Sequence, residues 1–291
     1  MTTEGLAELI AVHLWAVLLV IASVMLLAAW LLWEGLQRFG PAIDAWLRGW
    51  FARIHPHARS LPLPGAVLSA WDIVRRLGLQ VLASMAVAVV ACIGFVEIAD
   101  EIAPDEDLGQ FDAALSAALG RHASDAQLRI FSLLTHLGDK RFLIPLAGVV
   151  ALILLVRRQR FFAAAWVAAT VGGALLNSTL KEIFERSRPQ WLHHYASADG
   201  WSFPSGHSSG AFIVYGLLGY LVLVYLPKRF HVPLAALAML LIVCVGFSRA
   251  ILQVHYFSDV LGGYAFGAAW VAAWIAGLEA FRRRQADSMS T

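Results

Sequence analysis

The chain has 291 residues, of which 59% are hydrophobic and only 14% are charged. Its mean hydropathy of +0.69 is too high for a soluble globular protein of ordinary composition. A net charge of +2 argues against a nucleic-acid-binding protein. Both cysteines, Cys92 and Cys244, lie in apolar runs, which suggests neither a disulfide framework nor a metal cluster. These properties indicate a polytopic membrane protein.

The first half of the chain contains two long apolar runs, and a membrane span needs about 20 apolar residues. We expect the first span at residues 10–33, as a retained helix because it is too long for the core of a cleaved signal. An apolar stripe with helical spacing follows and is formed by Ile43, Trp46, Leu47, Trp50 and Ile54. This stripe is typical of a helix lying on the membrane surface, and a protein-binding face is the alternative. The second span is expected at residues 77–99, and residues 100–141 are predicted to form a solvated cap without a functional site.

The second half of the chain contains five further predicted spans. Three of them are expected at residues 142–156, 161–184 and 208–226. The apolar run 232–281 would be about 75 Å long as one helix, which exceeds twice the hydrocarbon thickness. It must therefore fold back, and the only polar stretch for a turn lies between Ser248 and His255. The sequence thus predicts an all-α membrane bundle, with an N-terminal segment (residues 1–70) that adds one transmembrane helix and a surface helix to a six-helix core (residues 71–291).

The distribution of Lys and Arg predicts the orientation of the bundle. Fourteen of the 22 Lys and Arg residues fall in polar segments that this topology places on one side. Because cytoplasmic loops are enriched in positive residues, that side is expected to be cytoplasmic. The N-terminus and the turn before His255 then face outside. Together with the compact loops, this suggests a bacterial inner membrane protein whose site faces the periplasm.

One polar cluster lies at the predicted turn in the last apolar run. His255 and Asp259 are four residues apart, so on a helix they share a face and can touch. A carboxylate fixes the tautomer of an imidazole and favours its cationic form. Arg249 adds a guanidinium suited to phosphate. A histidine near a helix end is more often structural than catalytic, so the interpretation depends on the other clusters.

Two further clusters on the same side also suit an anion. Lys181 and Arg188 are two helical turns apart and are expected to bracket an anion from one helix face, with snorkelling at a helix end as the alternative. Ser205 and Gly206 precede a predicted helix whose N–H groups and positive end would face a phosphate. An ordinary N-cap role for Ser205 is compatible with this. His207 can donate a proton to a leaving oxygen.

Three motifs together resemble the signature of the type 2 phosphatidic acid phosphatase (PAP2) superfamily, in its membrane lipid phosphatase branch. They are Lys181-x6-Arg188-Pro189, Pro204-Ser205-Gly206-His207 and Ser248-Arg249-x5-His255-x3-Asp259. Every position of the signature matches, in order and with its internal spacings. The resemblance covers about residues 77–281 and does not explain the N-terminal segment. It implies hydrolysis of a phosphate ester or anhydride at the outer membrane face, without a metal or another cofactor.

The resemblance also implies roles for individual residues. His255 would attack phosphorus and form a phosphohistidine, Asp259 would orient and charge His255, and His207 would protonate the leaving group and later activate water. The residues expected to hold the phosphoryl oxygens are Lys181, Arg188, Ser205, Gly206 and Arg249. Arg186, outside the signature, is interpreted as a helix-end or supporting charge.

The expected partners are the bilayer and a lipid phosphate, with no nucleic acid, and the oligomeric state is left open. The candidate substrates are undecaprenyl pyrophosphate, phosphatidylglycerol phosphate, phosphatidic acid and the phosphates of lipid A. One alternative is a lipid-to-lipid phosphotransferase with the same site. Another is a non-catalytic protein that binds or transports lipids.

Overall fold

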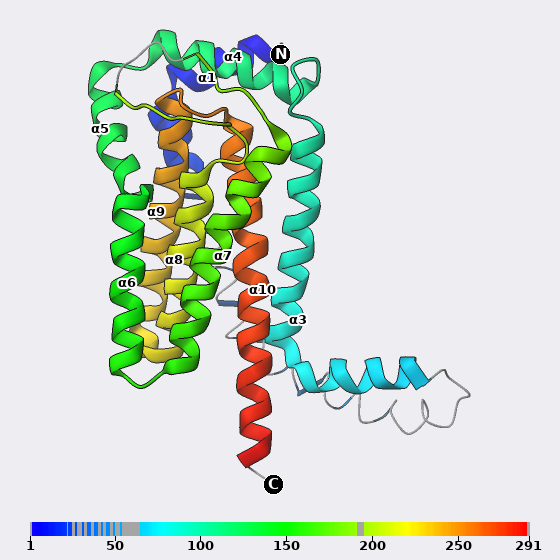
Figure 1. Cartoon of the computed structure of the whole chain (residues 1–291). Helices are drawn as coiled ribbons and strands as arrows, with labels where there is room; N and C mark the ends of the chain where they lie inside the picture. The colour runs from blue at the N-terminus through cyan, green and yellow to red at the C-terminus, as the bar shows by residue number, and fades with distance from the viewer. Residues whose placement is uncertain are drawn as a thin grey trace.

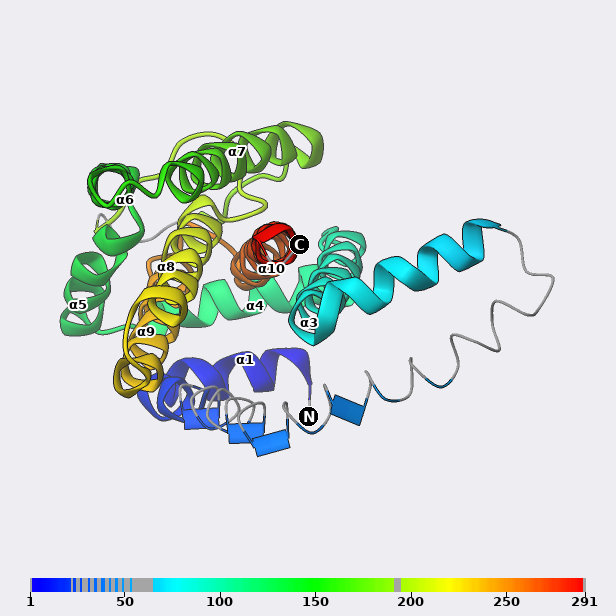
Figure 2. The same cartoon turned by 90° about the horizontal axis from the view of Figure 1, so that it is seen from below.

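A computed structural model describes residues 2–21, isolated positions between 23 and 53, and residues 65–190 and 195–289. Six long helices of this described part form a bundle (Figures 1 and 2). They are α3 (Gly65–Asp100), α6 (Lys140–Val156), α7 (Arg160–Phe184), α8 (Gly206–Tyr225), α9 (His231–Ile251) and α10 (Phe257–Met289). The first turns of α3 project outward from the bundle. Helix α10 is central and packs against both α3 and α8. The predicted all-α bundle with a six-helix core is therefore confirmed.

The surface of this bundle is suited to lipid. Five of the described helices are long and apolar enough to cross a membrane, and α6, with 17 residues, is at the lower limit for a span. Helix α3 leaves a row of large apolar side chains exposed, formed by Val87, Val89, Val90, Ile93 and Val96. Such a continuous apolar face is typical of contact with acyl chains and not with water.

A cap of short helices covers one end of the bundle, at the top of Figure 1. It consists of α4 (Asp107–His122), α5 (Asp125–Thr135), the 3-10 turn η1 (His136–Gly138) and α1 (Thr3–Val12). Helix α1 packs on α4, with Ala7 and Ala11 buried against the apolar side chains of the cap. Glu8 accepts hydrogen bonds from Arg121 and from His122, the latter between Oε2 and Nε2 at 2.7 Å.

This packing changes the first predicted span. The chain bends by 90° between Thr3–Val12 and Leu14–Ile21. Residues 10–12 therefore belong to the cap helix α1, and the predicted start of the span at residue 10 is wrong. Ala11 is buried against the cap and Ile10 is partly buried there, whereas Val12 remains exposed. The span continues as a helical segment at Leu14–Ile21, and only isolated positions of it are described after residue 21. The predicted surface helix at residues 43–54 lies largely outside the described residues.

The predicted reversal of the last apolar run is confirmed. Helix α9 ends at Ile251, α10 begins at Phe257, and the two are joined by a buried turn on the cap side. Gln253 adopts a left-handed backbone conformation (φ 54°) that lets the chain turn back within a few residues. Its side-chain amide donates to the carbonyl oxygen of Ser116 at 2.7 Å, which ties the turn to α4.

The opposite end of the bundle carries the basic connections. The turn between α6 and α7 contains Arg157 and Arg158, and the 3-10 turn η2 (Lys228–Phe230) joins α8 to α9. In Figure 1 both connections and the C-terminus lie away from the cap. The structure thus places these cations at the end opposite to His255, as the predicted topology requires.

Candidate active site

The three predicted clusters meet beneath the cap, where α7 ends, α8 begins and α9 turns into α10. At this point Ser205 N donates to the carbonyl oxygen of Asp259 at 3.0 Å, which joins the second motif to the third. Glycine permits this close approach of α10, because a Cβ on Gly263 would lie 2.8 Å from the Ser205 carbonyl oxygen. The Gly262-Gly263 pair is therefore a packing seam that holds the site together.

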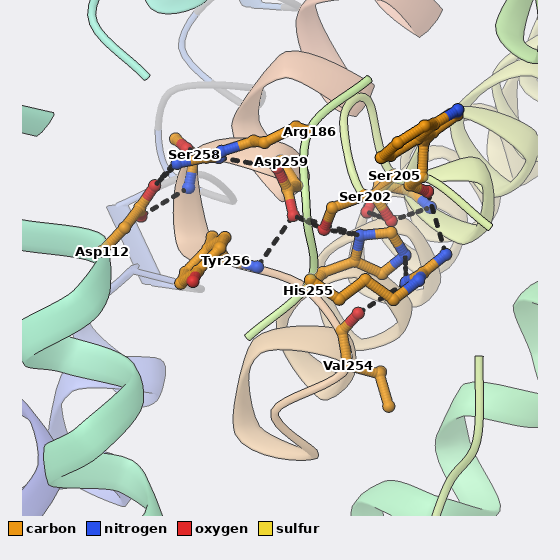
Figure 3. Close-up of polar contacts among 12 residues, drawn as sticks. Asp112, Arg186, Ser202, Ser205, Val254, His255, Tyr256, Ser258 and Asp259 are labelled. Atoms are coloured by element: carbon orange, nitrogen blue, oxygen red, sulfur yellow. Dashed lines mark hydrogen bonds and ion pairs between the residues drawn. The ribbon is translucent and has the colours of Figure 1, made fainter. Parts of the chain in front are cut away.

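His255 is fixed by Asp259 one helical turn away. Its Nδ1 lies 3.2 Å from Asp259 Oδ2, and both side chains are almost fully buried. The same carboxylate oxygen accepts from the backbone N–H of Tyr256 at 2.8 Å and from the hydroxyl of Ser202 (Figure 3). With Nδ1–H donating to the carboxylate, the lone pair of His255 stays on Nε2, on the opposite edge of the ring.

The charge state of His255 differs from the sequence-based expectation. Burial lowers the pKa of His255 to about 3, and this outweighs the hydrogen bond and the negative charge of Asp259, which raise it. At neutral pH the imidazole is therefore neutral before substrate binds. A neutral ring keeps a lone pair on Nε2, and this is the form that can act as a nucleophile.

Lys181 and Arg188 approach each other through a loop and not along a helix face. Helix α7 ends at Phe184, and Glu185 takes a left-handed backbone conformation (φ 43°), so Arg188 lies beyond the helix. Lys181 Nζ and Arg188 Nη2 both donate to the carbonyl oxygen of Trp201, at 2.5 Å and 3.0 Å. The predicted shared helix face is wrong, because the helix ends at Phe184 and the chain has left it before Arg188.

Arg188 is held next to the Nε2 edge of His255. Its Nη1 lies 3.1 Å from His255 Nε2 and donates to the carbonyl oxygen of Val254 at 2.6 Å. Its other nitrogens donate to the carbonyl oxygens of Asp199 and Gly200. The planar guanidinium is thus oriented before any ligand binds. A pocket with a volume of 710 Å³ opens beside it and is lined by Ser187, Arg188, Pro189, Gln190, Gly200 and Trp201.

The second motif forms the predicted helix N-terminus. Ser205 is the N-cap of α8, and its Oγ accepts from the backbone N–H of Ser208 at 3.4 Å. Gly206 starts the helix, and a Cβ there would lie 3.3 Å from Asn177 Oδ1, so a larger residue would crowd α7. His207 follows and is only partly buried, with Nε2 3.9 Å from Asp139 Oδ2. The N–H groups and positive end of α8 therefore point toward the same region as Arg188.

Arg249 completes the cationic side of the site. It is 3% exposed and donates from Nη1 to Thr135 Oγ1 of the cap at 2.7 Å. Its Nε is buried and has no hydrogen-bond partner within the described part of the chain. A buried guanidinium donor without a partner is costly, and an anion bound in the site is the kind of acceptor that would satisfy it.

The cap contributes to the site, so the prediction of a solvated cap without a functional site is wrong. Thr135 contacts Arg249, Asp139 lies near His207, and Asp112 bonds to Arg186 behind Asp259. The acidic opening Asp105–Asp107 is exposed, as expected. One feature of the sequence could have indicated that Asp112 is buried: it falls on the apolar face of α4 with Leu115 and Leu119. A carboxylate in an apolar stripe is usually paired.

No cluster of three or more His, Cys, Asp or Glu side chains suited to a metal ion occurs in the described ranges. The groups gathered around His255 are instead cations and backbone donors, formed by Lys181, Arg188, Arg249 and the start of α8. Such a set suits a phosphoryl group, whose transfer depends on positioning and charge stabilisation. A membrane bundle with this site is a membrane enzyme that acts on phosphate groups.

Comparison with known proteins agrees with this class. Residues 160–283 match the model of the PAP2 superfamily. The chain is 36% identical to phosphatidylglycerophosphatase B of Bacillus subtilis (strain 168), over 46% of this chain and 66% of that protein. It is 31% identical to the lipid A 1-phosphatase of Rhizobium etli, over 54% of this chain and 72% of that protein.

A solved structure is similar over nearly its whole length. The crystal structure of a transmembrane PAP2 type phosphatidylglycerolphosphate phosphatase from Bacillus subtilis superimposes with a TM-score of 0.60. The sequence identity is 28%, and the match covers 71% of this chain and 98% of that one. The chain therefore belongs to the PAP2 superfamily and is a membrane-embedded phosphatase of that family.

Proposed function

We propose that this protein is an integral membrane lipid phosphatase that hydrolyses a phosphomonoester or pyrophosphate of a lipid through a phosphohistidine at His255. One observation carries the proposal. Asp259 Oδ2 lies 3.2 Å from His255 Nδ1, whereas Nε2 lies 3.1 Å from Arg188. A phosphoryl group held by Arg188 would thus be next to the nitrogen that bears the lone pair.

The reaction proceeds in two displacements. In the first, Nε2 of His255 attacks phosphorus, the bond between phosphorus and the leaving oxygen breaks, and His207 gives that oxygen a proton. In the second, His207 takes a proton from water, the oxygen attacks phosphorus, and the P–N bond breaks. Lys181, Arg188, Arg249, Ser205 and Gly206 hold the phosphoryl oxygens throughout. A covalent intermediate divides one difficult step into two easier ones.

The relatives support a lipid phosphate as the substrate. They are named as phosphatases of phosphatidylglycerol phosphate and of lipid A, so these two lipids are the first candidates for this chain. The site lies at the cap end of the spans, where a lipid can enter from the side and present its headgroup. The pocket beside Arg188, with Gln190 and Trp201 in its wall, offers room for that headgroup.

The proposed location is a bacterial inner membrane, with the site facing the periplasm. Support comes from the basic turns at Arg157, Arg158, Lys228 and Arg229, which lie at the end opposite to His255. Positive loops favour the cytoplasmic side. The cap and the active site are then outside.

The test is release of phosphate by purified protein in detergent with EDTA present. The panel contains undecaprenyl pyrophosphate, phosphatidylglycerol phosphate, phosphatidic acid and lipid A, with His255→Ala as the inactive control. We expect release that survives EDTA, needs no acceptor lipid and disappears in the variant. Equal activity of His255→Ala would contradict the proposal, and phosphate transfer only in the presence of an acceptor lipid would make the protein a phosphotransferase.

A further inference from the structure

A second carboxylate lies behind the pair formed by His255 and Asp259. The guanidinium of Arg186 separates the two carboxylates: Nη1 donates to Asp259 Oδ1 at 2.7 Å, and Nη2 donates to Asp112 Oδ2 at 2.8 Å. Figure 3 shows Asp112, Arg186 and Asp259 in one row that ends at His255. The row joins α4 of the cap to the nucleophile, although Asp112 and Arg186 are 74 residues apart.

Asp112 also holds the start of α10. It is 1% exposed, and its Oδ1 accepts from the backbone N–H of Ser258 at 3.0 Å. The hydroxyl of Ser258 donates to the other carboxylate oxygen of Asp112, Oδ2. The first N–H groups of a helix have no partner within the helix, so Asp112 supplies from α4 the cap that α10 needs. Asp259 lies one residue further along the same turn, and its position therefore depends on Asp112.

Arg186 is fixed on every side by this arrangement. Besides the two carboxylates it contacts Ser258 Oγ at 2.7 Å and the carbonyl oxygen of Ile102 at 3.2 Å. Its guanidinium lies 4.5 Å from the centre of the Tyr256 ring, a cation–π distance. A guanidinium held in this way cannot turn toward the phosphate side of His255, so its role is confined to Asp259 and Asp112.

The charges of the row favour the covalent intermediate. With a neutral imidazole, two carboxylates face one guanidinium, and the row carries one excess negative charge. Phosphorylation of Nε2 leaves Nδ1–H in place and makes the ring cationic, so the row becomes neutral. Burial raises the pKa of Asp112, and the hydrogen bonds from Ser258 and Arg186 oppose this shift. The negative charge of Asp112 thus depends on an intact row.

We propose that Asp112 is a positioning residue of the phosphoryl-transfer reaction, acting through Arg186 and Ser258 to orient Asp259 and to stabilise the phosphorylated form of His255. This inference rests on the proposed function, because it assumes that His255 is the nucleophile. It assigns a role in the chemistry to the cap helix α4, none of whose residues belongs to the three motifs.

The test uses the isosteric variant Asp112→Asn in the full-length protein in detergent. The asparagine can still accept from Ser258 N–H but lacks the charge. We expect kcat on the best lipid of the panel to fall about tenfold or more, because a hydrogen bond to a charged group is lost. KM should change less than about twofold, since the phosphate side of the site is intact. Asp107→Asn is the matched control: it is the same substitution at an exposed position of α4, and it should leave kcat unchanged.

A double-mutant cycle with Arg186→Met keeps the test decisive if Asp112→Asn also lowers the melting temperature. If Asp112 acts through Arg186, then Asp112→Asn should lower kcat less than about threefold in the Arg186→Met background. Fully additive losses would overturn the inference, as would an unchanged kcat in the single variant. His255→Ala separates the two proposals: if it is inactive while Asp112→Asn is fully active, only the positioning role fails, whereas an active His255→Ala refutes the proposed function.

Discussion

The two sides of His255 are built in opposite ways. The front side, formed by Lys181, Arg188, Arg249 and the start of α8, gathers positive groups and leaves a buried Arg249 donor without a partner among the described residues. The rear side, formed by Asp259, Ser202, Ser258, Arg186 and Asp112, pairs its charges with one another. The front side thus offers a buried donor to an anion, whereas the polar groups of the rear side already bond to one another and hold Asp259 beside His255.

The largest expected effect comes from breaking the rear side at Asp259. Asp259→Asn removes the charge that stabilises a cationic ring and can invert the tautomer of His255, because the amide also donates. We expect kcat to fall about 10³-fold to 10⁴-fold, as in histidine–aspartate pairs generally. Initial rates of phosphate release measure this, and a loss below tenfold would show that the rear side does not control the nucleophile.

The next effect comes from the front side at Arg188. Arg188→Lys keeps the positive charge but loses the planar fork and the hydrogen bonds to four backbone carbonyl oxygens, which are those of Val254, Asp199, Gly200 and Trp201. We expect kcat/KM to fall about 100-fold, since both phosphate contact and loop position are lost. Arg129→Lys, at an exposed position of α5, is the control. Wild-type kcat/KM in Arg188→Lys would mean that Arg188 does not hold the substrate.

A smaller effect is expected at Ser202, on the rear side. Ser202→Ala removes one donor to Asp259 Oδ2, but the Tyr256 N–H and Arg186 still hold the carboxylate. We expect a loss of kcat of about threefold to tenfold, the value of a single hydrogen bond. The exposed Ser178→Ala on α7 should be neutral. If Ser202→Ala were as inactive as Asp259→Asn, the carboxylate would depend on one hydroxyl and not on the whole rear side.

The smallest expected change is in the protonation of His255. Because burial places its pKa at about 3, the ring should remain neutral as the pH falls from 8 to 5. Its nucleophilic form is lost only as the pH falls toward that pKa. Histidine-selective NMR in detergent can follow the ring, with the His255 signal identified by its absence in His255→Ala. A midpoint between pH 6 and 7, the ordinary range of histidine, would contradict this by showing that Asp259 offsets the effect of burial.

The sequence predicted the bundle and the front side because both follow local rules. The length of the last apolar run required a turn near His255, and the spacing of Ser205 and Gly206 before an apolar run predicted a helix N-terminus. The alternation of the predicted spans placed the three motifs on one side of the membrane, and the basic turns indicated which side that is. These inferences need only helix geometry and the thickness of the membrane.

On the rear side, the sequence predicted Asp259 beside His255 and a supporting charge at Arg186. It did not reveal Asp112, Ser202 and Ser258 or the true geometry of the loops. Asp112 meets Ser258 across 146 residues, and no spacing rule connects two such positions. The early end of α7 at Phe184 depends on Glu185 taking a left-handed conformation and on the contact of Arg186 with Asp112 of the cap. The bend at His13 depends on α1 packing on α4. Each of these features results from tertiary contacts, which override local propensity.

The most direct measurement is to trap the covalent intermediate. Purified protein is mixed with a ³²P-labelled lipid phosphate from the panel, stopped within milliseconds in alkaline detergent, and mapped by mass spectrometry. The two-step account predicts an acid-labile, alkali-stable phosphate on His255 that forms before free phosphate, is absent from His255→Ala and is reduced in Asp112→Asn. Steady release of phosphate without any labelled protein, or label on another residue, would contradict it.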